Sequence, residues 1–176
     1  MHDWSNLVVD HSAALERFQR TAGKISADRW SQPCAPGKWS PAEITSHLVE
    51  SYQVLRGELT GGPGMQLRLG VLRRWLFRHT VLPRILATGK FPVGARAPRE
   101  TRPRGAGGSS TALLLALSEQ ADGFVQSLSQ RTRAGRVRLT HAYFGSLSAR
   151  QALRMVTVHT SHHADQLARV IETLVA

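Results

Sequence analysis

The sequence predicts an all-α protein, a bundle of four core helices, and three observations support this prediction. Apolar residues recur at spacings of three and four in four separate windows, which is the period of one helix face. Two of these windows begin with a capping box, the paired hydrogen-bonding motif of helix N-termini. The chain has 176 residues, 41% of them hydrophobic, which suits one domain with a substantial core. We therefore expect residues 1–176 to form a single domain.

Charge and cysteine content narrow the class of protein. The formal net charge is +11, which favours contact with anions: nucleic acid, an anionic membrane or acidic small molecules. The single cysteine, Cys34, excludes an internal disulfide and a cysteine-based zinc knuckle, and it fits a cytoplasmic protein. The N-terminal residues carry Asp3 and Asp10 without a long apolar run, so we do not expect a signal peptide. Five arginines between residues 67 and 86 exclude a simple membrane-spanning helix there.

The first two core helices are predicted at residues 4–28 and 40–59. The apolar face of the first includes His11, which we interpret as a histidine at a helix interface, with metal binding as the alternative. Ser40 and Glu43 form a capping box at the start of the second helix. A proline directly after the cap is also typical of a helix start.

Residues 62–108 are predicted to be a basic insertion between the second and third core helices. A helix is expected from Met65 to about Thr88, and Pro83 should kink or end it. Its apolar face is expected to pack on the bundle: Leu69, Leu72, Trp75, Leu76, Leu82 and Leu86. Its other face carries solvent-exposed arginines: Arg73, Arg74, Arg78 and Arg84. A helix that binds a membrane surface or nucleic acid is the alternative.

A long loop is predicted from residue 89 to residue 110. It is rich in glycine and proline and holds a basic cluster of candidate anion-binding residues: Arg96, Arg99, Arg102 and Arg104. Loops of this length are usually functional or disordered. Two interpretations stay open, namely closure over an anionic substrate near a metal site and plain disorder.

The last two core helices are predicted at residues 111–130 and 148–176. Between them lie a basic link and a short aromatic segment, residues 139–147, which contains His141. Ser148 and Gln151 form the second capping box.

The last helix carries the chemistry. His159 and His163 lie one turn apart inside its apolar stripe. Burying imidazoles on an apolar face costs free energy unless something pairs with them, and this i, i+4 spacing suits a divalent metal. His162 points about 60° away from that face, so we place it at the rim of the site. Gln166 is a candidate for supporting a ligand from outside.

His47, at the edge of the apolar stripe of the second helix, is the candidate third ligand. Three imidazoles with open positions suit Zn(II) or Ni(II) first, with Fe(II), Mn(II) and Co(II) as alternatives. The zinc-protease motif is absent because Thr160 follows His159, so this turn holds no built-in general base. We expect a metal-bound water to be the nucleophile, with Glu50, one turn beyond His47, as a candidate assistant. Catalytic residues are otherwise unassigned.

Two segments resemble the DinB-like superfamily. Its second-helix signature is similar to Lys38-Trp39-Ser40-Pro41-Ala42-Glu43-Ile44 followed by His47-Leu48. Its fourth-helix region is similar to His141-x-x-Phe144-Gly145-x-Leu147-Ser148 followed by His159-x-x-His162-His163-x-x-Gln166. The resemblance implies an up-down-down-up four-helix bundle, a metal held by His47, His159 and His163, and frequent homodimers. Members include transferases that use low-molecular-weight thiols, a maleylpyruvate isomerase group and a metal-dependent hydrolase. The long basic stretch from Met65 to Arg104 departs from the family pattern.

Three functions follow from these observations. The first is a metal-dependent hydrolase or thiol-dependent transferase that acts on a small molecule. The second is a non-catalytic metal-binding stress or accessory protein, in which the ion stabilises helix packing. The third is an anion- or nucleic-acid-binding module that uses the arginine-rich insertion, although no helix-turn-helix or aromatic RNA-binding motif accompanies the charge. Expected partners are a small-molecule substrate and a second copy of the chain, with nucleic acid or an anionic membrane as alternatives.

Overall fold

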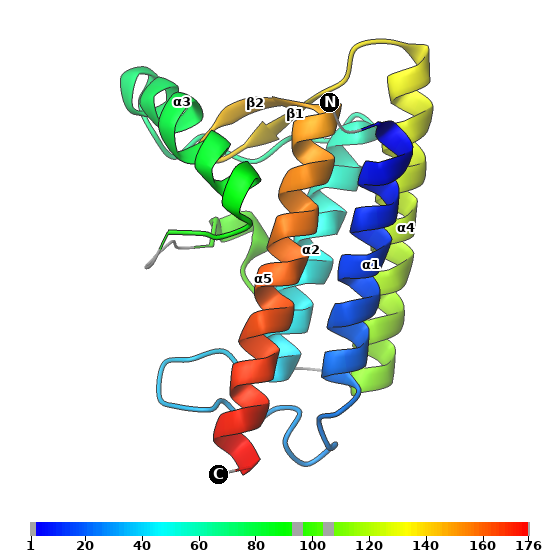
Figure 1. Cartoon of the computed structure of the whole chain (residues 1–176), viewed down its shortest axis with the longest axis vertical. Coiled ribbons are helices and arrows are strands. Elements are labelled where there is room, and N and C mark those ends of the chain that lie inside the picture. Colours follow the sequence, from blue (N-terminus) through cyan, green and yellow to red (C-terminus); the bar gives the residue numbers. More distant parts are fainter. Residues whose placement is uncertain (1–2, 93–96, 104–107, 176) are drawn as a thin grey trace.

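A computed structural model describes residues 3–92, 97–103 and 108–175 of the chain. Four long helices form the bundle: α1 (Trp4–Ala22), α2 (Pro41–Leu59), α4 (Ser110–Ala134) and α5 (Ala149–Val175). Helices α1 and α5 run in one direction and α2 and α4 in the other (Figure 1). The prediction of an all-α, up-down-down-up bundle is confirmed.

Both predicted capping boxes are present and set two of the helix starts. The Ser40 N–H donates to the Glu43 carboxylate at 2.8 Å, and the Ser40 hydroxyl accepts from the Glu43 N–H at 3.2 Å. Ser148 and Gln151 repeat this exchange at the start of α5. Helix α1 ends at Ala22 and not at residue 28, with Gly23 as its C-cap residue.

The core lies between the four helices, with α1 packed mainly on α5 and α2 mainly on α4. Fully buried aromatic and aliphatic side chains come from every helix of the bundle: Phe18, Leu48, Tyr52, Leu117, Phe124, Leu153 and Leu167. His11 is buried at this helix interface, where its Nε2 lies 2.8 Å from the hydroxyl of Tyr52. The same hydroxyl lies 2.8 Å from Thr160 Oγ1, so one polar chain joins α1, α2 and α5.

The insertion is the crossover that this topology requires. Because α2 and α4 run parallel, the chain must return along the bundle between the end of one and the start of the other. It does so through α3 (Val71–Thr88) and the 3₁₀ turn η1 (Arg99–Thr101), on the side of α2 and α5 (Figure 1). Helix α3 begins at Val71 and not at Met65, and it continues past Pro83 to a left-handed Gly89 (φ +67°). The crossover therefore places α3 against α5 and η1 against α2.

The orientation predicted for α3 is wrong in its N-terminal half. Leu82 and Ile85 are buried as expected, but Leu72, Trp75 and Leu76 are exposed. Arg74 and Arg78 are half-buried instead, and both donate hydrogen bonds to backbone carbonyls. The consequence is an apolar surface that the bundle does not cover.

A β-hairpin that the sequence analysis missed closes one end of the bundle. Strands β1 (Arg138–His141) and β2 (Gly145–Ser148) pair antiparallel, with Leu139 opposite Leu147. The Glu58 carboxylate at the end of α2 accepts from the N–H and the hydroxyl of Thr140, which fastens β1 to the bundle. Gly145 makes the turn with φ +69°. Among the described residues, no helix has the length and apolar character needed to cross a bilayer.

Candidate metal centre

Three histidines from two helices meet at the inner wall of the bundle. His47 projects from α2, and His159 and His163 project from successive turns of α5, as their i, i+4 spacing predicts. One ring nitrogen from each lies within 4.8 Å of the other two. His47 and His163 are buried, and His159 is half-buried.

The ring nitrogens that face one another are the three Nε2 atoms. His159 Nε2 lies 3.0 Å from His47 Nε2 and 3.0 Å from His163 Nε2. Imidazoles that share a tetrahedral Zn(II) at ~2.0–2.1 Å have nitrogens about 3.3 Å apart. The spacing around His159 is therefore close to that of a shared ion.

Hydrogen bonds outside the cluster fix how two of the rings are protonated. His47 Nδ1 donates to the carbonyl oxygen of Thr101, and His163 Nδ1 donates to Gln166 Oε1 at 2.8 Å. A neutral imidazole that donates through Nδ1 has an unprotonated Nε2. The unprotonated Nε2 atoms of His47 and His163 thus both point a lone pair at His159 Nε2. Because His159 Nε2 carries at most one proton, it can donate to only one of them. A cation at the centre satisfies all three nitrogens, so this donor set fits a metal ion.

The pKa values of the three histidines are lowered, which favours the neutral imidazoles that metal binding requires. Burial lowers the pKa of His47 to about 4, although its bond to Thr101 acts in the opposite direction. Burial, and then the neighbouring histidines, hold the pKa of His159 well below the usual 6.5. Burial does the same for His163. All three rings are therefore neutral near pH 7, the form that ligates metals.

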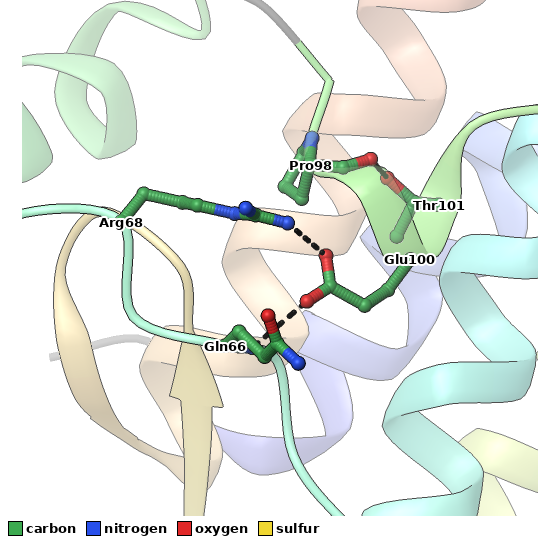
Figure 2. Close-up of polar contacts among 5 residues, drawn as sticks. All are labelled: Gln66, Arg68, Pro98, Glu100 and Thr101. Carbon is green, nitrogen blue, oxygen red and sulfur yellow. Dashed lines mark hydrogen bonds and ion pairs between the residues drawn. The ribbon is translucent and has the colours of Figure 1, made fainter.

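The insertion holds the Thr101 carbonyl in place against His47. Glu100 accepts from the Gln66 N–H at 3.1 Å and from Arg68 Nη2 at 3.1 Å, which clamps η1 to the chain entering α3 (Figure 2). Burial alone would raise the pKa of Glu100, but its hydrogen bonds and Arg68 lower it below the usual value. The Glu100 carboxylate is therefore ionised near pH 7, and its contact with Arg68 is an ion pair. Second hydrogen-bond partners of this kind orient metal-binding histidines.

A cavity of about 1460 Å³ opens beside the cluster, with all three histidines in its wall. Most of the wall is apolar and comes from α2, α3, α5 and the hairpin: Leu55, Val81, Ile85, Phe144, Leu147, Met155 and Val156. Three cationic side chains also line it: Lys38, Arg102 and Arg169. Glu43 is the only carboxylate in the described lining, and it belongs to the capping box.

Two of the remaining predicted site residues lie against the cluster. Gln166 bonds to His163, as described above, and its supporting role stays a prediction. His162 lies outside the three-histidine group but lines the cavity, where its ring is 5.3 Å from that of Phe91. Burial and the nearby Arg169 lower the pKa of His162, and Asp165 partly opposes them.

His141 lines the same cavity from the end of β1. Its Nδ1 accepts from the Tyr143 N–H at 3.3 Å, and its ring stacks on Phe144. Burial lowers its pKa to about 4. The neutral ring therefore carries its proton on Nε2 and can donate a hydrogen bond.

Other predicted residues are not brought to the cluster. Glu50 is half-buried on α2 and belongs neither to the metal-binding group nor to the cavity wall within the described residues. Arg102 lines the cavity, whereas the exposed Arg99 does not contribute to the described wall. Arg96 and Arg104 lie outside the described residues.

The sequence comparison agrees with this geometry. A sequence model of the DinB superfamily matches residues 11–167, a span that contains all three histidines. The chain belongs to the DinB superfamily. Comparisons with curated proteins and with solved structures gave no match.

Sequence reasoning missed several parts of this DinB-superfamily site. Thr101 acts through its backbone carbonyl, which any residue type would supply, so no sequence signal could have identified it. Trp39 and Phe91 pack against the cluster, with ring centroids 4.9 Å from His47 and 5.8 Å from His159. Trp39 stands in the quoted family signature, but that pattern does not indicate a contact with His47. Phe91 had no signal beyond being an aromatic residue in a long loop.

Proposed function

We propose that this DinB-superfamily protein is a metal-dependent enzyme that acts on a small molecule at the His47–His159–His163 cluster. The observation that carries the proposal is the convergence of three Nε2 atoms on one point in the wall of a large cavity. A divalent ion bound there would supply Lewis-acid chemistry and a water of lowered pKa. Zn(II) and Ni(II) are the first candidates for this donor set.

The protein's own residues define what can bind beside the ion. The cavity wall is mainly apolar, and its charged members Lys38, Arg102 and Arg169 are cationic. His141 adds a neutral hydrogen-bond donor. We therefore propose a substrate with an apolar body and a negatively charged or carbonyl group, which these donors would orient.

An enzymatic role fits the site better than a purely structural ion. Structural zinc sites are closed by four protein ligands, whereas catalytic sites keep a position open. Within the described residues, no carboxylate or thiolate joins the three histidines. The ion would thus keep an open position, and the three histidines that would hold it lie in the cavity wall.

Metal analysis of the purified protein tests the first half of the proposal. After reconstitution with Zn(II) or Ni(II), wild type should retain about one ion per chain, because three imidazoles bind it. His159→Ala and His163→Ala should lose most of it. His162→Ala is the matched control, because this histidine lines the same cavity outside the ligand group, and it should keep the ion. A wild type that binds neither metal would remove the basis of the proposal.

Cobalt substitution separates an open site from a closed one. If the ion has an exchangeable position, azide should change the visible spectrum of the Co(II) protein. A spectrum that azide does not alter would favour the non-catalytic, structural role. Screens with ester and amide substrates, and with electrophiles in the presence of low-molecular-weight thiols, then distinguish hydrolase from thiol transferase. In either case, activity should vanish in His163→Ala.

Homodimer formation also belongs to this proposal, and it rests on family resemblance alone. Light scattering of the purified chain measures it directly. A monomer at all concentrations would contradict it without affecting the metal centre.

A further inference from the structure

The N-terminal half of helix α3 presents large apolar side chains to solvent, whereas its Arg74 and Arg78 are half-buried against the protein. Leu72 is 78% exposed and Trp75 is 59% exposed, and their neighbours Val71 and Leu76 are exposed as well. Together with Leu67, on the segment that enters the helix, these four residues form what we call the α3 tip. Large apolar side chains gathered at one place on a surface usually mark an interaction site.

The inverted orientation is held by specific bonds. Arg74 Nη1 donates to the Leu69 carbonyl at 3.2 Å, and Arg78 Nη1 donates to the carbonyls of Phe144 and Ser146 in the hairpin. Turning α3 about its axis to bury Leu72 and Trp75 would break these bonds. The exposure of the tip is therefore a property of the folded chain.

The rest of α3 is firmly attached. Leu82 and Ile85 are buried in the core, and Arg154 Nε of α5 donates to the Leu86 carbonyl at 2.9 Å. The N-terminal half of α3 extends away from the bundle beside the hairpin (Figure 1). The C-terminal half of α3 is thus anchored to the bundle, while the α3 tip stays exposed.

Charge around the tip indicates the partner. The sequence from residue 59 to residue 99 contains no aspartate or glutamate. Arg68 pairs with Glu100, and the described part of this segment also exposes four basic residues: Arg73, Arg84, Lys90 and Arg99. A second copy docked through the same face would bring two such basic segments together and repel. Nucleic acid offers phosphates to the arginines but no apolar layer for Leu72 and Trp75.

An anionic bilayer surface offers both kinds of contact. Its headgroups attract arginine and lysine, and its acyl chains accept leucine, valine and tryptophan at the interface. We infer that the α3 tip docks the protein on anionic membrane surfaces, with Leu72 and Trp75 inserted and the exposed Arg73 at the headgroups.

Docking would also place the cavity near the lipid. Phe77, Val81 and Ile85 extend along α3 from the tip, and all three line the cavity beside the histidines. An apolar substrate dissolved in the bilayer would therefore be close to the cavity wall. The docking itself does not depend on any metal or reaction at the site.

Co-sedimentation of the full chain with lipid vesicles tests the inference. Wild type should pellet with phosphatidylcholine vesicles that contain phosphatidylserine and should stay in solution with phosphatidylcholine alone. Leu72→Ser combined with Trp75→Ser should weaken binding by at least about tenfold, since both inserted side chains are lost. Arg73→Glu should weaken it as well, and added salt should reduce binding by wild type.

A matched control uses exposed apolar residues elsewhere. Val9 on α1 is 64% exposed and Leu115 on α4 is 60% exposed, so Val9→Ser with Leu115→Ser removes similar side chains far from the tip. This variant should bind vesicles as wild type does. Circular dichroism melts verify that both double variants are folded.

Three results would overturn the inference. One is vesicle binding that is equal in wild type and the Leu72→Ser, Trp75→Ser variant. Another is a wild-type dimer in light scattering that this variant abolishes, which would make the tip a self-association surface. The third is salt-sensitive binding to duplex DNA that the same variant loses while phosphatidylserine vesicles are not bound.

Discussion

The buried polar chain His11–Tyr52–Thr160 makes a quantitative prediction about stability and pH. Burial lowers the pKa of His11 to about 4 in the folded chain, with Asp122 partly opposing this effect. In the unfolded chain this pKa is near 6.5. Between these two values the unfolded chain binds the proton and the folded chain does not. The contribution of His11 to stability is therefore complete above pH 6.5 and is lost as the pH falls toward 4.

The magnitude follows from the two pKa values. Proton linkage gives a loss of ~2 kcal/mol in the free energy of unfolding between pH 7 and pH 5. His11→Phe removes this loss, because no proton binds at that position in either state. It also removes one buried hydrogen bond, which costs ~1 kcal/mol at pH 7. The stability curves of wild type and His11→Phe should therefore cross between pH 7 and pH 5.

Urea unfolding followed by circular dichroism at several pH values measures these curves. The remaining buried histidines are present in every protein compared, so their effects cancel in the difference. Tyr52→Phe is the matched control, because it removes the hydrogen bond between Tyr52 and His11 but keeps the imidazole. Its curve should run parallel to wild type at lower stability. If the curve of His11→Phe also runs parallel to wild type, the reasoning from burial is refuted.

Four further predictions concern the supports of the site, the hairpin contact and helix α2. Gln166→Leu should lower metal affinity roughly 10- to 100-fold in a chelator competition, because a ligand loses its orienting bond; unchanged affinity would contradict that role. Glu100→Gln should speed proteolysis of the insertion and weaken metal binding less than Gln166→Leu does, and equal digestion would show that the clamp is unimportant. In urea unfolding, Gly64→Ala should destabilise by ~2 kcal/mol, because the new Cβ would lie 2.5 Å from Glu58 Oε1 and displace a triply bonded carboxylate. Gly57→Ala adds a Cβ in open space on α2 and should stabilise the protein by up to ~1 kcal/mol. If Gly64→Ala and Gly57→Ala changed the free energy of unfolding in the same direction, the predictions for these two glycines would be contradicted.

The features that sequence reasoning found are those encoded by local spacing. A capping box needs residues three apart, and a helix face needs residues three or four apart, so Ser40, Glu43, His159 and His163 are recognisable without a structure. Those spacings were enough to predict the bundle and two members of the cluster. His47 could be added because it falls at the edge of the apolar stripe of its own helix.

The features that were missed depend on contacts between distant segments. Thr101 supports His47 across 54 positions of chain, and it does so through a backbone carbonyl. Arg78 turns inward because the hairpin, 66 positions away, offers it backbone carbonyls. Composition alone assigns arginine to solvent and tryptophan to the core, so the exposed side of α3 was predicted the wrong way round.

The crossover between α2 and α4 has an evolutionary consequence. The three clustered histidines lie on core helices, where most substitutions disturb packing, but much of the cavity wall belongs to the long connection between α2 and α4. That connection can change in length and composition without rebuilding the bundle, so a superfamily member can keep the histidine cluster while its cavity wall changes. Exchanging residues 62–108 between superfamily members should therefore transfer substrate preference more readily than exchanging any core helix. Identical histidines in two superfamily members therefore do not imply the same reaction.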